Sequence, residues 1–331
     1  MTRLSSHTIY LLASVCMIGC LSDADRKNPV DPQSDTFQNV GGITGQTFSF
    51  FAPFRPLPDV EVRLSPGSML TFSDQNGRFV FEKVTPGKYV ISASRSGFAP
   101  AEDSISIEFL QTVSHQFNLD ALPTFDSVAV LSRHIRNTFP TPDIFFLAVA
   151  ARVDDPDGKG DIELVELQMP ALGFGDTLQA TATLGEFSTV ILQSEIPTGK
   201  IEDVLGRPFF LMAIDGAGFM TRSEATFLPR IISQAPQPDS PNGFALLNDP
   251  NPVLRWTGTN LPFDFTYRVE VVRTDLGLEN SVWTRSDLAN QTTSVRVDQA
   301  LLPGTYLWTV SAVDIFDNWS QSVQASFRIN Q

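Results

Sequence analysis

The densest group of side chains that could do chemistry is an acidic run within eight positions. It consists of Asp154, Asp155, Asp157 and Asp161. Carboxylate oxygens are preferred ligands of Ca²⁺, so these residues predict a loose calcium site. A helix-loop-helix calcium site is not expected, because Lys159 stands where such a loop needs a ligand and the flanks have strand patterns. The alternative is a solvated acidic hairpin in which Asp-Gly and Lys-Gly form the turn.

Three aromatic side chains in the C-terminal part are candidates for ligand stacking. They are Trp283, Phe316 and Trp319. Phe316 and Trp319 lie in a predicted loop, and loop aromatics on a β-sandwich can stack on sugars or enter a protein interface. In the alternative interpretation, Trp319 folds back as a lid on its own core.

Other reactive side chains are scarce. The 331 residues include three His and two Cys, which leaves most metal and nucleophile chemistries without their usual groups. The sequence contains no nucleophile elbow, phosphate loop, dinucleotide fingerprint or zinc spacing. We expect His115 at the edge of an apolar face and His134 in solvent. We therefore predict no catalytic residue, no cofactor beyond the possible Ca²⁺, and no enzyme activity; a carboxylate pair in a cleft stays open as the alternative.

The charge balance excludes one class of partner. Lys and Arg number 23 against 37 Asp and Glu, giving a formal net charge of −14. Nucleic-acid phosphates would be repelled by this average field, so we expect no nucleic-acid binding.

The amino terminus has the pattern of an export signal. Its apolar run at residues 9–18 is too short to cross a hydrocarbon core of ~30 Å, but it suits a secretory signal. Met17-Ile18-Gly19-Cys20 resembles the lipoprotein box of bacteria. The resemblance implies that residues 1–19 are a signal peptide and that Cys20 is lipidated. We expect anchoring to the bacterial cell envelope, at the outer membrane, through a tether over residues 20–40. A soluble secreted protein is the alternative.

From residue 41 onward, short alternating runs are separated by Gly, Pro, Asp and Asn. Turn signals every 8 to 12 residues favour an all-β chain of serial β-sandwich domains. We expect three of these domains, which span residues 41–122, 123–231 and 232–331. A proline-dense spacer at residues 234–243 should precede the third domain.

Residues 41–122 carry a specific resemblance. Asp74-x-x-Gly77-x-Phe79-x-Phe81 is followed by Pro86-Gly87-x-Tyr89 and then by Gly97-Phe98. This pattern resembles the carboxypeptidase regulatory-like domain. The resemblance implies a prealbumin-like sandwich of seven strands that carries no active site of its own.

The two C-terminal segments resemble immunoglobulin-like and fibronectin type III domains. In the last one, Trp256 lies on an early strand, and Tyr306 begins a late strand where its hydroxyl could make a corner hydrogen bond. Residues 213–218 parallel residues 312–317 at an offset of 99 positions. Both stretches have the pattern of a penultimate strand and its following loop.

Together these features predict a non-catalytic, lipid-anchored protein of the cell envelope. Its β-sandwich domains would bind a protein or a polysaccharide, and its membrane contact would be made through Cys20. Two more specific roles stay open, a carbohydrate-binding accessory of a glycan-utilisation system and a structural scaffold of the envelope.

Overall fold

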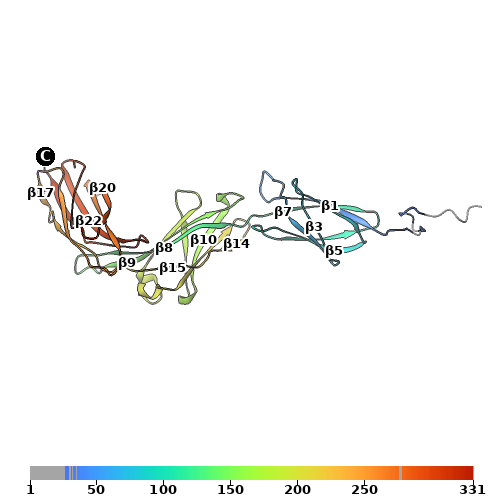
Figure 1. Cartoon of the computed structure of the whole chain (residues 1–331), viewed down its shortest axis with the longest axis horizontal. Coiled ribbons are helices and arrows are strands. Elements are labelled where there is room, and N and C mark those ends of the chain that lie inside the picture. Colours follow the sequence, from blue (N-terminus) through green and yellow to red (C-terminus); the bar gives the residue numbers. More distant parts are fainter. Residues whose placement is uncertain (1–26, 30, 32, 35, 276–277, 331) are drawn as a thin grey trace, which may run out of the picture. The chain divides into compact units, whose positions relative to one another are not determined.

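The computed structural model describes residues 27–330 except positions 30, 32, 35, 276 and 277. The chain divides into two compact units, one ending at residue 120 and the other beginning at residue 121. The predicted all-β fold is confirmed, because the described residues form strands and only four short 3₁₀ helices (Figure 1).

The first unit is a sandwich of two sheets. One sheet has the strand order β4-β1-β7 and the other β3-β2-β5-β6. Strand β1 pairs with β7 in parallel, whereas its pairing with β4 is antiparallel. The strands are β1 (Gly41–Ser49), β2 (Glu61–Ser65), β3 (Met69–Phe72), β4 (Arg78–Val84), β5 (Gly87–Ser94), β6 (Ala101–Ile107) and β7 (Thr112–Leu119).

The turn before β4 shows why the motif of this unit has its residue types. The Asp74 carboxylate accepts hydrogen bonds from the backbone N–H groups of Asn76 and Arg78, both at 2.8 Å. Gly77 has a φ of 72°, and a Cβ there would lie 2.4 Å from the Thr47 carbonyl oxygen. Only glycine fits this conformation and this approach.

Alternation along the strands builds the core of the first unit. Phe79 and Phe81 of β4 and Ile91 and Ala93 of β5 are alternate residues whose side chains are buried between the two sheets, while a register shift near Lys83 buries Val84 instead. The largest buried members of this core are Phe79, Phe81, Ile43, Leu64, Ile91, Phe117 and Leu119.

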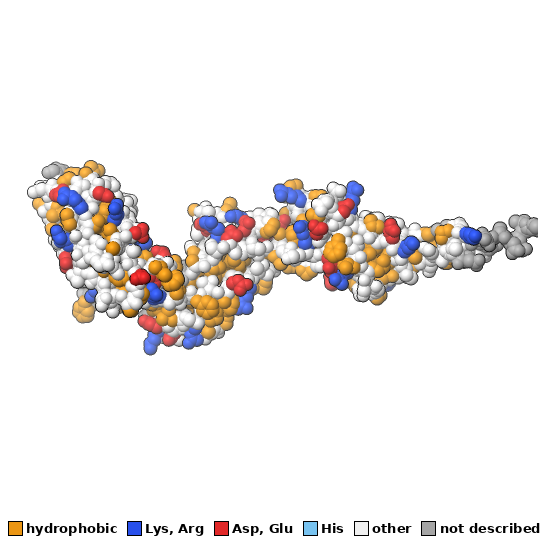
Figure 2. Space-filling view, in the orientation of Figure 1, with side chains coloured by type: hydrophobic (Ala, Val, Ile, Leu, Met, Phe, Trp, Pro, Cys, Tyr) orange, Lys and Arg blue, Asp and Glu red, His pale blue; other side chains and the backbone are white. Residues whose placement is uncertain are grey.

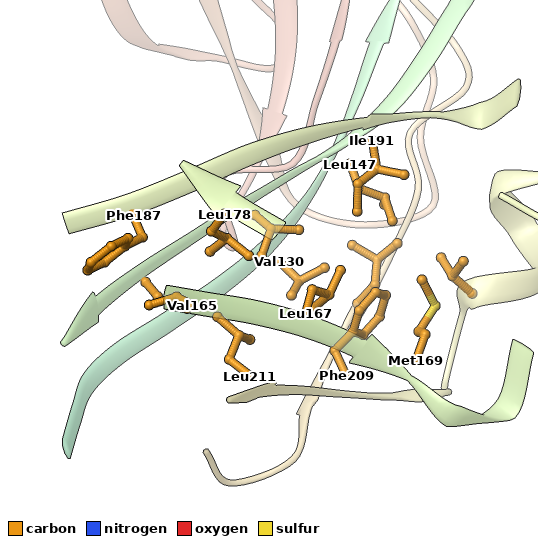
Figure 3. Packing of buried hydrophobic residues seen from close by; sticks show 14 of the residues in the cluster. Val130, Leu147, Val165, Leu167, Met169, Leu178, Phe187, Ile191, Phe209 and Leu211 are labelled. Carbon is orange, nitrogen blue, oxygen red and sulfur yellow. The ribbon is translucent and has the colours of Figure 1, made fainter. Parts of the chain in front are cut away.

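The second unit holds two hydrophobic cores. The first core lies between strands that span residues 124–227 (Figure 3). Leu167 and Phe209 point into it from neighbouring strands, and Leu147 and Ile191 close it from the other side. The strands are β8 (Thr124–Ile135), β9 (Ile144–Asp154), β10 (Ile162–Met169), β11 (Phe174–Ala180), β12 (Glu186–Leu192), β13 (Pro208–Asp215), β14 (Met220–Arg222) and β15 (Thr226–Phe227). The 3₁₀ helices are η1 (Lys159–Asp161), η2 (Pro170–Leu172), η3 (Gln193–Glu195) and η4 (Ile201–Val204).

The second core follows in residues 237–329. Trp256 and Trp308 are its largest fully buried side chains. The Tyr306 hydroxyl donates to the Leu302 carbonyl oxygen at 2.6 Å, which confirms the predicted corner hydrogen bond. The strands are β16 (Gln237–Ser240), β17 (Ala245–Leu247), β18 (Val253–Thr257), β19 (Phe265–Asp275), β20 (Leu278–Ala289), β21 (Ser294–Arg296), β22 (Gly304–Asp314), β23 (Trp319–Gln321) and β24 (Ala325–Ile329).

One hydrogen-bonded sheet runs through both halves of the second unit. Its main path is β14-β13-β10-β11-β12-β9-β8-β23-β22-β19-β20. The halves meet where β23 pairs with β8 in parallel, so that Trp319 faces Arg133 and Ser320 faces His134. The expected spacer is also partly structured, because Gln237–Ser240 forms β16 and pairs with β18. Those residues therefore belong to a sheet, and the prediction of a semi-rigid linker is wrong for them.

Candidate functional site

The four carboxylates of the acidic loop after β9 have different environments. Asp154 faces solvent, Asp155 is buried, and Asp157 and Asp161 are half-buried. The Asp154 side chain is 47% exposed, and its Oδ1 lies 3.7 Å from Lys159 Nζ. Lys159 thus neutralises Asp154 at the surface rather than entering the rest of the loop.

The other three predicted ligands lie deeper. Asp155 is 4% exposed, and its Oδ1 accepts from the Asp157 N–H at 2.8 Å. Asp157 Oδ2 accepts from the Ala121 N–H at 2.8 Å. The buried atoms Asp155 Oδ2 and Asp161 Oδ2 have no hydrogen-bond partner among the described residues.

A fourth carboxylate that sequence reasoning missed joins this group. Asp215, at the end of β13, is fully buried, and its Oδ2 also has no partner among the described residues. The signal was available, since the internal repeat aligns Asp215 with Asp314. Ile162 faces Asp215 across the β10–β13 ladder, which brings the two loops together.

Burial changes the acidity of this group. Desolvation raises the pKa of Asp155 to about 6; the Asp157 N–H opposes this shift, while the nearby negative charges add to it. Burial also raises the pKa of Asp161, with further contributions from Asp215 and Asp157. In the part of the chain that the structure describes, no three His, Cys, Asp or Glu side chains already form a group that could hold a metal ion.

Trp283 is not an exposed loop residue. It lies within β20, is 7% exposed and belongs to the second core of the unit. Its indole Nε1 donates to Asp298 Oδ1 at 2.7 Å. The expectation that Trp283 offers an exposed stacking surface is wrong, because β20 turns this ring toward the core.

Trp319 and Phe316 have different environments. Trp319 is the first residue of β23, not a loop residue, and its ring meets Phe146 edge-on at 6.1 Å between centroids. The Arg133 guanidinium lies 5.3 Å from the same ring. Phe316 remains in the turn and is 46% exposed. Trp319 therefore packs at the joint between the two halves of the unit, whereas Phe316 stays available to solvent.

His134 lies at the same joint and is 1% exposed, so the expectation of a solvated histidine is wrong. Its Nδ1 is 2.7 Å from Ser320 Oγ, and its Nε2 is 3.1 Å from Asp143 Oδ2. These three residue types also form hydrolase triads. Ser320 is fully buried here, however, so the hydroxyl has no route to a substrate and the group ties β8 to β23.

A cluster of exposed phenylalanines in the first unit had not been predicted. Phe50, Phe51 and Phe54 follow β1 directly and are 42%, 38% and 55% exposed. The rings of Phe50 and Phe51 meet edge-on at 5.0 Å. Figure 2 shows hydrophobic side chains exposed among charged ones on both units. The sequence contains a pattern that could have predicted this cluster. Three Phe lie within five residues, next to Pro53 and Pro56, which favour the end of a strand.

The phenylalanine loop directly follows β1, the central strand of the β4-β1-β7 sheet, whose outer face is the second feature of this unit. Registered pairs across β1 and β7 place uncharged polar side chains side by side on this face, and a hollow of about 320 Å³ opens there. The hollow is lined in part by Thr44, Gln46, Arg78, Val80, Ser114 and Gln116.

The predicted signal peptide at residues 1–19 and the predicted lipidation site Cys20 lie outside the described residues. Within residues 27–330, apart from the gaps named above, no helix has the length and apolar character needed to cross a membrane.

Comparison with solved structures finds distant similarity. The major pilin subunit of Bacillus cereus is 7% identical over 85% of this chain and 91% of the pilin, with a TM-score of 0.30. Fibronectin(III)-like modules of Clostridium thermocellum CbhA are 15% identical over 63% of this chain and 93% of theirs, with a TM-score of 0.29. Similarity at this level assigns no function.

Comparison of sequences is informative for the first unit. Among curated proteins, no sequence matches this chain. A family model does match: the carboxypeptidase regulatory-like domain covers residues 52–120, inside the segment where the sequence motif had indicated it.

Proposed function

We propose that this chain is a non-catalytic binding protein that is exported and anchored to the bacterial cell envelope, at the outer membrane, by lipid on Cys20. Its first unit would bind a polysaccharide on the outer face of the β4-β1-β7 sheet. The observation that carries the proposal is the combination of this face, polar apart from Val80 and with Arg78 at the hollow, with the exposed phenylalanine loop that follows β1.

The chemistry of the face suits sugar hydroxyls. Amides and hydroxyls both donate and accept hydrogen bonds, as sugar hydroxyls do. Gln116 Nε2 already donates to Asn118 Oδ1 at 2.8 Å, which orients both amides along β7. Across the ladder, Gln46 faces Gln116 and Phe48 faces Asn118. Polar groups fixed on a rigid sheet can recognise an extended chain of sugars along the strand direction.

The phenylalanine loop would supply the apolar half of the contact. Exposed rings offer flat surfaces for the C–H faces of sugars, and they lose little conformational entropy on binding. Backbone pairing holds the loop ends, because the Ser49 N–H donates to the Arg55 carbonyl oxygen at 2.9 Å. The rings are therefore presented by an anchored loop.

A structural role in the envelope is a second candidate, favoured by one observation. The continuous sheet and the β8–β23 pairing join the two C-terminal sandwiches within a single unit. Such a joined pair could act as a rigid structural element of the envelope.

The test starts with protein purified from bacterial membranes. Mass spectrometry should find an acylated Cys20 at the new amino terminus; retained residues 1–19 or an unmodified Cys20 would contradict the anchoring. The same material is then applied to an array of envelope and extracellular polysaccharides. We expect binding that falls at least tenfold in a Phe51→Ala, Phe54→Ala double variant and in Gln46→Ala.

The matched control is Leu184→Ala, because Leu184 is 70% exposed on the second unit and should not affect binding. Binding that survives all three first-unit substitutions would disprove this face as the site. Recovery of a stable membrane protein partner, with no polysaccharide bound, would favour the scaffold instead.

A further inference from the structure

The two halves of the second unit repeat one turn with the same hydrogen bonds. Asp215 Oδ1 accepts from the N–H groups of Ala217 and Phe219, at 3.0 and 2.8 Å. Asp314 Oδ1 accepts from Phe316 and from Asn318, both at 2.9 Å. The positive φ that closes each turn falls on matching residues, Gly218 at 88° and Asp317 at 68°.

The second carboxylate oxygen separates the two turns. Asp314 Oδ2 accepts from Asn318 Nδ2 at 3.0 Å and lies 3.6 Å from Arg230 Nη1. The corresponding Asp215 Oδ2 is buried with no partner among the described residues. Identical turns thus leave one carboxylate neutralised and the other without a counter-charge.

Two more buried carboxylate oxygens have no partner among the described residues: Asp155 Oδ2 and Asp161 Oδ2. Both belong to the 155–161 loop, which packs on the Asp215 turn. The Gly216 N–H donates to the Asp161 carbonyl oxygen at 2.8 Å, and a Cβ on Gly216 would lie 2.8 Å from Asp161 Oδ1. Asp155 precedes Asp161 by two consecutive turns, which meet at Gly158. Its exposed fraction is 4%. Lys159, the cation of this loop, pairs with Asp154 at the surface.

Buried carboxylate oxygens without donors or counter-ions are unfavourable unless a cation compensates them. We propose that the free oxygens of Asp155, Asp161 and Asp215 bind one Ca²⁺, so that Asp215 takes the place of Asp154 and Asp157 in the sequence-predicted set. In the described residues these side chains form no group that could hold a metal ion, so binding requires the three carboxylates to move closer together.

The donor set selects the ion. All the side-chain ligands are oxygens, and Ca²⁺ accepts six to eight oxygens from carboxylates, carbonyls and water in a flexible geometry. Mg²⁺ requires near-octahedral geometry with shorter bonds and loses its water reluctantly. Zinc prefers nitrogen and sulfur ligands, which this cluster lacks among the described residues.

The test uses the full mature chain at pH 7.5 after treatment with EDTA. Titration of CaCl₂ in a calorimeter should give saturable binding of one ion. At ~100-fold excess over Kd, the Tm of the protein should rise by about 5 °C or more, and EDTA should reverse the rise. Asp155→Asn and Asp215→Asn should each weaken binding at least tenfold, while both variants stay folded because Asn retains an accepting oxygen.

Asp154→Asn is the matched control and should bind Ca²⁺ as the natural chain does. Absence of heat and of any Tm shift at 5 mM Ca²⁺ would overturn the proposal. Loss of binding in Asp154→Asn but not in Asp215→Asn would overturn the ligand assignment. Equal affinity for Mg²⁺ would overturn the assignment of calcium.

Discussion

The turns at Asp215 and Asp314 have the same backbone but opposite electrostatic surroundings. Each aspartate uses one oxygen to cap the turn between two antiparallel strands, β13 and β14 in one half and β22 and β23 in the other. At Asp314 the other oxygen contacts Arg230, and Asn318 of the same turn accepts from the Ser132 N–H at 2.8 Å across the joint. At Asp215 the other oxygen is buried without a partner among the described residues, and Asp155 and Asp161 lie near enough to interact with this carboxylate. One carboxylate oxygen of each aspartate is therefore sufficient to form the turn. The surroundings of the other oxygen depend on the residues packed against it.

The largest expected effect comes from removing the neutralised aspartate. Asp314→Ala should lower the free energy of unfolding by about 3 kcal/mol, because it leaves two backbone N–H groups without acceptors and Arg230 without its partner. Urea unfolding followed by tryptophan fluorescence measures this loss. Asp249→Ala removes an exposed ion pair with Arg296 and should cost under about 1 kcal/mol. A loss at Asp314 no larger than at Asp249 would show that the turn does not depend on this side chain.

Substitution of each aspartate by asparagine should change the free energy of unfolding in opposite directions at the two turns. In the absence of calcium at pH 7.5, Asp215→Asn should raise the free energy of unfolding by about 1 kcal/mol, since it removes an uncompensated buried charge and keeps the cap. Asp314→Asn should lower it by about 1 kcal/mol, since it removes the ion pair with Arg230. The same urea experiment compares both variants. Changes of the same sign would contradict the electrostatic difference.

The smallest effect is a pH dependence at the joint beside Asp314. Burial lowers the pKa of His134, against the opposing influence of Asp143. The unfolded chain takes up a proton near pH 6.5 while the folded chain does not, so stability falls as pH drops below 6.5. The slope is at most about 1.4 kcal/mol per pH unit.

Subtracting the stability profile of His134→Gln from that of the natural chain isolates this histidine. The subtraction is needed because the raised pKa of Asp155 acts with the opposite sign, favouring the folded state as pH falls toward 4. Asp143 has a lowered pKa and contributes only at more acidic pH. A difference profile that is flat between pH 7 and 5 would show that His134 is not held neutral at the joint.

Much of the fold could be predicted because its signals are local. The alternation in residues 78–84 and the Asp74 to Gly77 turn depend on neighbouring residues, so their structure follows from residue type. The same holds for the Tyr306 corner, whose hydroxyl bonds a carbonyl four residues earlier. The internal repeat also held, down to the hydrogen bonds of its turns.

The candidate sites were predicted less well because they depend on distant contacts. His134 is buried where β8 pairs with β23, 186 positions away, and Trp283 is buried in the second core of its unit. The sequence revealed the acidic run, but it did not show which of its carboxylates lie together. Asp154 pairs with Lys159 at the surface, and Asp215 joins the group from another strand.

The amino-acid sequence by itself determined the all-β fold, several turns and the carboxypeptidase regulatory-like pattern of the first segment, because side-chain alternation and turn chemistry act over a few residues. Only the tertiary structure decided which carboxylates come together and which aromatic rings reach solvent. Those outcomes depend on strand pairing between residues as far apart as His134 and Ser320, 186 positions along the chain. Sheet pairing brings such residues together, and the surroundings it creates set the charge and exposure of each side chain.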